Sequence, residues 1–267
     1  MGADTKSLRT RIKSVDSTLH LTKAMGLVAS SKIRRATDAM IKSREYSDAF
    51  SGLINQLIAC PDCKKSPYME KRSTGRARII VIAGDRGLAG GYNSNVFRFC
   101  RDYVDAEFIP IGKRACERFE KSHKSAEMFS SADAVKLAEQ LCADFMNAEY
   151  DMLGIISTKY ISIMSQEPQI KWILPLVRND DVVSQSVIFE PDEETILKTT
   201  VREYVAGCII AAVRESFASE VAARRCAMDS AGKNAQQMID DLQLQYNRAR
   251  QGAITQELTE IVAGSGT

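Results

Sequence analysis

The fold is decided near the amino terminus, where residues 8–40 read LRTRIKSVDSTLHLTKAMGLVASSKIRRATDAM. Mostly apolar or small residues recur there at alternating steps of four and three, at Leu8, Ile12, Val15, Leu19, Thr22, Gly26, Ala29, Ile33, Ala36 and Met40. This heptad spacing places all of them on one face of a helix. It therefore predicts a long helix that packs against another helix along that face.

A second heptad pattern lies near the other end of the chain. It consists of Met228, Ala231, Ala235, Met238, Leu242, Gln245, Ala249 and Gly252. Both patterns contain many small residues, which let two helix backbones approach closely. Because the two ends are each other's partners, the chain must leave and return. The sequence therefore predicts a long antiparallel coiled coil.

The positions of the prolines agree with this arrangement. All six lie between positions 61 and 191, and proline inside a helix costs about 3 kcal/mol. Helices over 6–59 and 193–262 would be about 80 Å and 105 Å long at about 1.5 Å per residue. The alternative is a set of shorter helices that break at Gly26, Gly52, Gly207 or Gly232.

The middle of the chain has a different pattern. Residues 77–83, ARIIVIA, form an apolar run of strand length, which is typical of a strand buried on both faces. Further strands are expected at 107–111, 128–129, 152–156, 170–177 and 187–189. Helices are expected at 94–104, 113–121 and 132–149. This alternation predicts an inserted, Rossmann-like α/β domain with a mostly parallel sheet.

The predicted organisation therefore has three parts. Residues 1–60 form the first helix of the coiled coil, residues 75–192 form the inserted α/β domain, and residues 193–267 form the second helix. No apolar run approaches the roughly 20 residues that a membrane-spanning helix needs.

The loop GDRGLAGGYN, residues 84–93, is the feature that most resembles part of an enzyme. It follows a strand and precedes a helix, where α/β folds often bind phosphates. However, its first glycines are spaced GxxG, and no Gly-Lys-Ser/Thr follows. We expect a tight structural loop or a docking surface, with a nucleotide-dependent enzyme as the alternative.

The remaining polar residues predict no catalytic or metal site. The seven cysteines are scattered, and Cys60 and Cys63 are the only close pair, so zinc binding would need about two more ligands. The two histidines are far apart in the sequence, and no motif pairs a nucleophile with a base. We expect no cofactor and no metal.

Charge is concentrated at the start of the chain, although the whole protein carries only +2. Residues 1–45 contain ten basic and four acidic side chains, an excess of six positive charges. An acidic protein collar would attract such a helix. The alternatives are a solvated basic face and a coiled coil that binds nucleic acid, whose affinity would fall steeply with salt. We expect no nucleic-acid partner.

Several stretches resemble one known family. Residues 254–264, ITQELTEIVAG, and the preceding YNRARQ, residues 246–251, resemble the carboxy-terminal signature of the gamma subunits of F-type ATP synthases. Residues 21–35, the loop 84–93 and residues 220–228 resemble further parts of that family, in the same order.

The resemblance implies a rotor shaft without catalytic activity of its own. The coiled coil would stand inside an alpha3-beta3 catalytic hexamer, and the inserted domain would lie on the membrane c-ring beside the epsilon subunit. Such a shaft couples proton or sodium flow through the ring to ATP synthesis or hydrolysis in the hexamer, and it regulates ATPase activity.

The resemblance also implies which residues take part in coupling. Met25 matches a position that meets the lever loops of the catalytic subunits, and Lys23 belongs to the same segment. Contacts with the hexamer are also expected from Lys32, Arg34, Arg35 and Arg250. Four residues are expected to hold the contact region together, namely Arg224, Gln251, Thr255 and Glu257. Glu190 matches the region that faces the membrane ring.

Two further expectations concern regulation and location. Plastid members of the family carry a redox-active dithiol on an extra insert, but the Cys60–Cys63 pair lies elsewhere, so redox control is not expected. The first 16 residues do not resemble a transit peptide. We therefore expect a bacterial protein, bound peripherally to the cytoplasmic side of the cell membrane.

Overall fold

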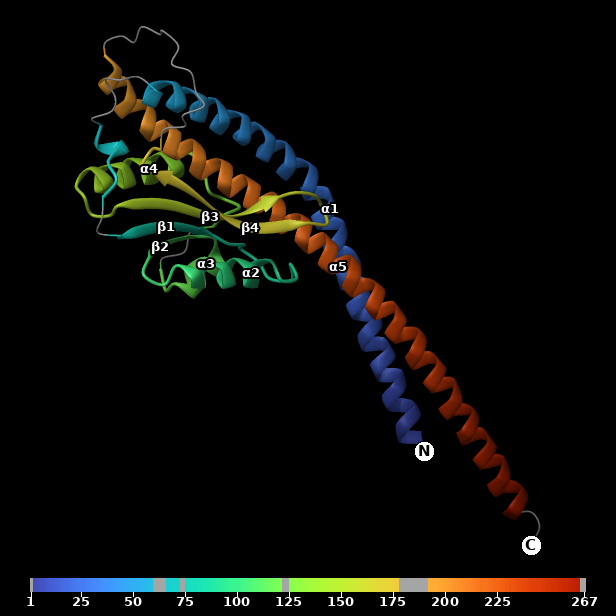
Figure 1. Cartoon of the computed structure of the whole chain (residues 1–267). Helices are drawn as coiled ribbons and strands as arrows, with labels where there is room; N and C mark the ends of the chain where they lie inside the picture. The colour runs from blue at the N-terminus through green and yellow to red at the C-terminus, as the bar shows by residue number, and fades with distance from the viewer. Residues whose placement is uncertain (1, 60–65, 73–74, 122–124, 178–191, 265–267) are drawn as a thin grey trace. The chain divides into compact units, whose positions relative to one another are not determined.

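Two very long helices dominate the computed structural model, which describes residues 2–59, 66–72, 75–121, 125–177 and 192–264 (Figure 1). Helix α1 spans Gly2–Ala59 and helix α5 spans Glu193–Gly264. Gly26 and Gly52 lie inside α1, and Gly207 and Gly232 lie inside α5. The prediction of unbroken helices is confirmed, and the alternative of helices broken at glycines is wrong.

The chain divides into two compact units. One unit consists of residues 1–30 and 224–267, the two ends of the chain, and the other consists of residues 31–223. In the first unit, Leu19 packs with Ala235 and Ile239, and Gly26 lies opposite Met228. Residue numbers rise along α1 as they fall along α5, so the two helices are antiparallel as predicted.

The seam predicted on α1 is confirmed along its whole length. All ten of its positions are buried or half-buried, whereas the residues between them are mostly exposed. In the unit of residues 31–223, the seam continues with Ala36 and Met40, which pack on Ala218 of α5. The heptad spacing therefore identified the contact face of this helix correctly.

The seam predicted on α5 is partly wrong. Met238 is 44% exposed, whereas its neighbour Ile239 is 5% exposed and packs on Leu19. Gln245 and Gly252 are also exposed, whereas Leu242 is buried. Alternating steps of three and four can be placed on this stretch in two ways, or phases, which share every second position. The positions between them differ by one residue, as Met238 and Ile239 do. Because adjacent residues point about 100° apart around a helix, only one phase can face α1. Packing against Leu19 selects the phase that contains Ile239.

The inserted domain contains one mixed sheet in the order β2-β1-β3-β4. Strands β1 (Ala77–Ile82), β2 (Glu107–Ile111) and β3 (Met152–Tyr160) are parallel, and β4 (Gln166–Leu174) is antiparallel to β3. The predicted α/β fold with a coiled coil is confirmed.

Two predicted strands differ from the structure, and a third lies outside the described residues. The strand expected at 170–177 begins at Gln166, and it is antiparallel because only a short hairpin joins it to β3. Residues 128–129 form no strand, since Met128 lies in a turn and is 79% exposed. The strand expected at 187–189 lies outside the described residues.

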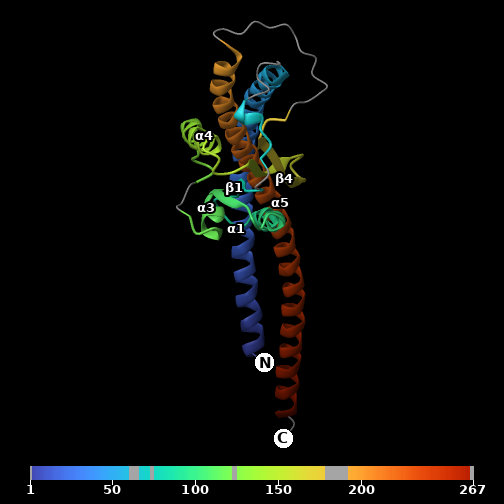
Figure 2. The same ribbon diagram turned by 60° about the vertical axis from the view of Figure 1, so that its left-hand side comes forward.

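Helices cover both faces of the sheet (Figures 1 and 2). On one face, Ile79 and Val81 of β1 pack with α2 (Tyr92–Phe99) and α3 (Lys113–Arg118). On the other face, Ile80 and Ile82 join a larger core with α4 (Ser131–Met146) and parts of α1 and α5. Short 3-10 helices lie at Pro67–Met69 and Cys100–Asp102. None of the helices in the described part of the chain is long and apolar enough to cross a membrane.

Candidate functional site

The loop after β1 is organised around the side chain of Asp85. Its Oδ1 accepts hydrogen bonds from the backbone N–H groups of Lys113 and Ala126, both at 2.9 Å. Its Oδ2 accepts from the Ser125 hydroxyl at 2.5 Å and from Glu127 N–H at 2.9 Å. Asp85 therefore connects its own loop to the start of α3 and to the segment before α4.

This environment keeps Asp85 charged. Burial raises the pKa of the carboxyl group, but the hydrogen bonds from Ser125, Glu127, Lys113 and Ala126 outweigh burial and lower the pKa below its ordinary value. Both oxygens of the carboxylate thus already accept hydrogen bonds from four donors of the protein itself. Asp85 is therefore a structural anion.

The glycine at the start of the loop is held between the loop and α5. Gly84 N–H donates to Oδ1 of Asn93 at 2.9 Å, and the Gly84 carbonyl accepts from Arg114 N–H at 3.1 Å. A Cβ at Gly84 would lie 2.7 Å from Cδ of Glu220 on α5. An occupied Gly84 N–H and the neighbouring Asp85 carboxylate favour a structural loop over phosphate binding at this place.

Helix α5 also binds the sheet through polar side chains. Strand β3 pairs with β1 only as far as Ile156, so one edge of its last residues is left without a neighbouring strand. There Thr158 N–H donates to Ser216 Oγ at 3.1 Å, and Ser219 Oγ donates to the Thr158 carbonyl at 3.2 Å. Tyr160 N–H donates to Glu215 at 3.1 Å. The helix thus replaces a missing strand.

The sequence reasoning did not identify these residues. Ser216, Ser219 and Glu220 are each at most 2% exposed, and they lie in a mostly buried stretch of α5. Polar residues at steps of three and four inside an apolar helix would have been a usable signal, because buried polar groups are normally hydrogen-bonded.

Two ion pairs fix α1 to the rest of the unit formed by residues 31–223. Arg44 Nη2 lies 2.8 Å from Glu215 Oε1, and Lys32 Nζ lies 2.6 Å from Glu127 Oε1. Arg86 lies 3.6 Å from the other oxygen of Glu127. Lys32 was expected to contact a partner protein, but here it has an internal partner 95 residues away.

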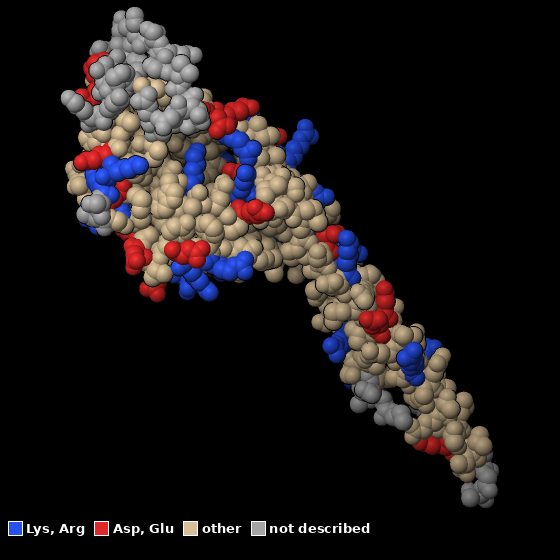
Figure 3. Space-filling model, in the orientation of Figure 1, with Lys and Arg blue, Asp and Glu red and all other residues tan. Residues whose placement is uncertain are grey.

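The other basic residues expected on α1 point to solvent. Arg34 and Arg35 are exposed in the unit of residues 31–223, and Lys23 is exposed in the unit of the two chain ends. Figure 3 shows Lys and Arg side chains at intervals along the long helices, with Asp and Glu side chains between them.

Met25 lies beside a close approach of α1 and α5 in the unit of the two chain ends. The residue is half-buried, and its neighbour Gly26 lies so close to α5 that an added Cβ would be 3.7 Å from Cβ of Met228. One turn earlier, the Thr22 hydroxyl lies 3.6 Å from the Cβ position of Gly232. By contrast, Leu27, two residues after Met25, is 73% exposed. Small residues therefore bring the helices together here and leave large apolar side chains outside.

The carboxyl end of α5 carries the remaining residues expected to take part in coupling. Arg250, Gln251 and Thr255 are exposed, and the Thr255 hydroxyl donates to the Gln251 carbonyl at 2.9 Å. Four apolar side chains near them are 46–70% exposed, namely Ile254, Leu258, Ile261 and Val262.

The structure describes the side chain of only one of the three other residues expected to take part in coupling. Arg224 of α5 is half-buried. Residue 257 lies within α5, but the described structure does not extend to its side chain, so the role expected for Glu257 stays a prediction. Glu190 lies outside the described residues.

Cysteine and histidine form no cluster in the described parts of the chain. No group of three or more His, Cys, Asp or Glu side chains there could hold a metal ion. The five described cysteines are free thiols, and His20 lies 3.7 Å from Asp16 on the exposed surface of α1. Cys60 and Cys63 lie outside the described residues.

Comparison with known proteins gives a consistent match over the whole chain. The family model described as ATP synthase matches residues 4–267. The ATP synthase gamma chain of Ruminococcus albus is 39% identical over 284 aligned positions, which cover 98% of each of the two chains.

Solved structures share the fold at lower sequence identity. A chain of the Euglena gracilis mitochondrial ATP synthase, in the OSCP/F1/c-ring structure in rotational state 3, matches with a TM-score of 0.68 and 17% identity. The match covers 98% of this chain and 94% of the Euglena chain. A chain of the central stalk and c-ring of Tetrahymena thermophila mitochondrial ATP synthase matches with a TM-score of 0.64 and 21% identity, over 79% and 99% of the two chains.

Proposed function

Because the chain belongs to the ATP synthase gamma family, we propose that it is the central rotor shaft of an F-type ATP synthase. The observation that carries this proposal is the pair of unbroken helices, α1 and α5, whose ends pack on each other through apolar side chains and at two glycines, Gly26 and Gly232. A helix of 72 residues is far longer than a single domain core can bury. Much of its surface is therefore available to partner proteins.

The partners follow from the kind of complex in which relatives occur. The Tetrahymena match is a central stalk with a c-ring, and the Euglena match comes from a structure of OSCP, F1 and c-ring. By analogy, the ends of the helices stand inside an alpha3-beta3 hexamer, and the inserted domain rests on the c-ring beside the epsilon subunit.

The chain itself performs no chemistry in this proposal. Ion flow turns the ring and the shaft, and each orientation of the shaft favours a different conformation of the surrounding catalytic subunits. A partner shifts an equilibrium between two conformations only if it makes different contacts with each of them. An asymmetric shaft supplies those contacts, so it couples rotation to ATP synthesis or hydrolysis and regulates ATPase activity.

Exposed and half-buried side chains on the helices supply the contacts. Met25 and Lys23 meet the lever loops of the catalytic subunits, and Arg34, Arg35 and Arg250 pair with acidic loops of the hexamer. The exposed apolar side chains around Ile254 support this assignment, because large exposed apolar surface is typical of interaction sites.

The remaining expected roles are part of the same proposal. Arg224, Gln251, Thr255 and Glu257 keep the helical contact region in place, and Glu190 faces the membrane ring. Lys32 contributes indirectly, because its ion pair with Glu127 fixes α1 to the inserted domain.

The segments 1–60, 75–192 and 193–267 act as first shaft helix, inserted domain and second shaft helix. The complex is bound to a membrane, and the chain associates peripherally with it. We place it on the cytoplasmic side of a bacterial cell membrane.

Co-purification tests this proposal most directly. A tagged full chain should isolate the catalytic hexamer subunits, the epsilon subunit and the c-ring, and the isolated complex should hydrolyse ATP. The purified chain alone should neither bind nor hydrolyse ATP in calorimetry. Stoichiometric ATP binding by the chain alone would favour the nucleotide-dependent alternative and contradict the proposal.

A further inference from the structure

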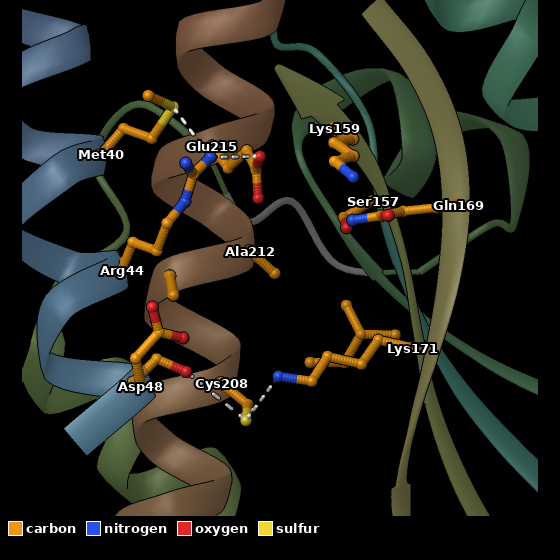
Figure 4. A pocket seen from close by; sticks show the side chains of 13 residues that line it. Met40, Arg44, Asp48, Ser157, Lys159, Gln169, Lys171, Cys208, Ala212 and Glu215 are labelled. Atoms are coloured by element: carbon orange, nitrogen blue, oxygen red, sulfur yellow. Dashed lines mark hydrogen bonds and ion pairs between the residues drawn. The ribbon is translucent and has the colours of Figure 1, made fainter. Parts of the chain in front are cut away.

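A cavity of about 360 Å³ lies where α1 and α5 face strands β3 and β4 (Figure 4). All of its lining residues belong to the unit of residues 31–223. The cavity is open to solvent, because four of its lining residues are exposed, namely Arg44, Asp48, Lys159 and Lys171. Cys208 of α5 also lines it, although this residue is only 3% exposed. The cavity therefore gives small solutes a way to a buried sulfur.

The Cys208 sulfur is surrounded by polar groups from three elements. Ser47 Oγ of α1 and Lys171 Nζ of β4 each lie 3.7 Å from the sulfur. Figure 4 shows the Lys171 side chain pointing toward Cys208 across the cavity. Tyr204 lies one turn before Cys208 on α5. Burial raises the pKa of Tyr204, and the Cys208 sulfur raises it further through its charge and a hydrogen bond.

These neighbours fit a sulfur that carries an added oxygen better than a plain thiol. A thiol is only a weak hydrogen-bond donor and a weak acceptor, whereas an oxygen on the sulfur accepts strongly. The Lys171 ammonium and the Ser47 hydroxyl can both donate to such an oxygen. The lining also contains two acids, but Glu215 is paired with Arg44, and Asp48 is exposed, so water screens its charge.

Two other buried cysteines of the same unit provide a contrast. Burial raises the pKa of Cys100 to about 11 and that of Cys142 to about 12, and neither residue lines this cavity. Cys142 has a cation and a hydroxyl nearby, from Arg202 and Tyr68, but burial outweighs both. Since the thiolate is the form that reacts, these two thiols should be inert. Access through the cavity distinguishes Cys208 from them.

We infer that Cys208 is an oxidation site, at which a small hydroperoxide converts the thiol into a sulfenic acid inside the cavity. The sulfur attacks one oxygen of the peroxide, so that an S–O bond forms and the O–O bond breaks. The second oxygen takes the proton of the thiol and leaves, as water when the oxidant is hydrogen peroxide. The sulfur loses two electrons, and the peroxide gains them.

Lys171 and Ser47 are positioning residues for this step. Negative charge develops on the leaving oxygen as the O–O bond breaks, and an ammonium group at this place stabilises it. After the step, both residues can donate hydrogen bonds to the oxygen on the sulfur. The cavity supplies the room for that oxygen. The inference does not depend on the role of the chain as a shaft.

Limited oxidation of the purified full chain with hydrogen peroxide tests the inference. Catalase removes the peroxide, and the chain is then unfolded in excess dimedone, which bonds to sulfenic acids, so that trapping does not depend on access in the folded protein. Mass analysis of peptides reports each cysteine separately. Cys208 should be labelled at least about tenfold more than Cys100 and Cys142, because oxidation follows exposure and thiolate character. Equal labelling of the three cysteines would overturn the inference.

The variant Lys171→Gln should slow the labelling of Cys208 by about threefold or more, because the stabilising charge is lost. Lys159→Gln is the matched control, since it makes the same change in the lining of the same cavity. Lys159 pairs with Glu167, whereas Lys171 pairs with Ile155, four positions away along β3. This separation is about 13 Å along the strand, so the control should leave the rate unchanged. Equal rates in the two variants would contradict the inference.

Discussion

Gly84 and Glu220 lie so close together that a methyl group on Gly84 would be 2.7 Å from the carboxyl carbon of Glu220. The glycine lies two residues after the end of the first strand of the inserted domain, and the buried glutamate belongs to the long helix α5. The inserted domain and helix α5 are therefore in direct contact at this point. In a rotor shaft, such close packing holds the inserted domain against the helix.

Gly84→Ala should therefore destabilise the unit of residues 31–223. Overpacking of this kind costs about 1–3 kcal/mol, and chemical denaturation should report a loss in that range. Gly52→Ala in α1 is the control, because nothing lies within 4 Å of its Cβ position. It should raise stability by up to about 1 kcal/mol. Equal stability of the two variants would contradict the close approach.

Glu215 should contribute more to stability than an exposed acid. It accepts from Arg44 and from Tyr160 N–H, and its side chain is 16% exposed. Glu215→Ala should cost about 2–3 kcal/mol in denaturant unfolding, since a backbone donor and a cation lose their partner. Glu194→Ala, from an exposed pair with Lys198, should cost less than about 0.5 kcal/mol. If both variants lost the same amount, Glu215 would have no special role.

Asp85 should make stability depend on pH in the acid range. Its pKa is lowered in the folded protein, so its contribution is complete above the ordinary value of 3.8 and disappears as pH falls through the folded pKa. Asp85→Asn should destabilise the protein at pH 7 by about 2 kcal/mol or more, because donors lose a charged acceptor. Unfolding measured from pH 7 to pH 2 should also show a smaller pH dependence in this variant than in the wild type. An unchanged pH dependence would show that Asp85 is not the responsible group.

Ile239 and Met238 provide a test of the corrected helix seam. Ile239→Ala should cost about 2–4 kcal/mol in the unit of the two chain ends, because it removes a buried side chain that packs on Leu19. Met238→Ala should cost less than about 1 kcal/mol, since Met238 is 44% exposed. Amide hydrogen exchange near Leu19 measures both effects. A larger loss for Met238→Ala would restore the phase predicted from the sequence.

Met25→Lys should impair coupling in the assembled complex, because it adds a charge beside the loops that Met25 is proposed to contact. Proton pumping per ATP hydrolysed is the measurement, and it should fall well below the wild-type ratio. Gln140→Lys on the exposed surface of α4 adds the same charge elsewhere and should leave the ratio unchanged. Wild-type coupling in Met25→Lys would refute the proposed contact.

The predicted coupling residues have different surroundings in the structure, and their roles stay predictions. The positions of Arg34, Arg35 and Arg250 on exposed helix surface agree with a partner contact, although no comparison tests it. Lys32 was grouped with them because of its charge, but its partner Glu127 is distant in the sequence, so only folding revealed the pair.

By itself, the sequence determined the two long helices, the seam on α1 and the buried first strand. These features depend on local periodicity and on the absence of proline, which a single segment contains in full. The tertiary structure decided the phase of the α5 seam, where Ile239 rather than Met238 packs on Leu19. It also decided that β4 is antiparallel, that Asp85 holds three segments together, and that α5 replaces a strand beside β3. Each of these depends on which distant segments meet, and the energy of such a contact is not contained in either segment alone.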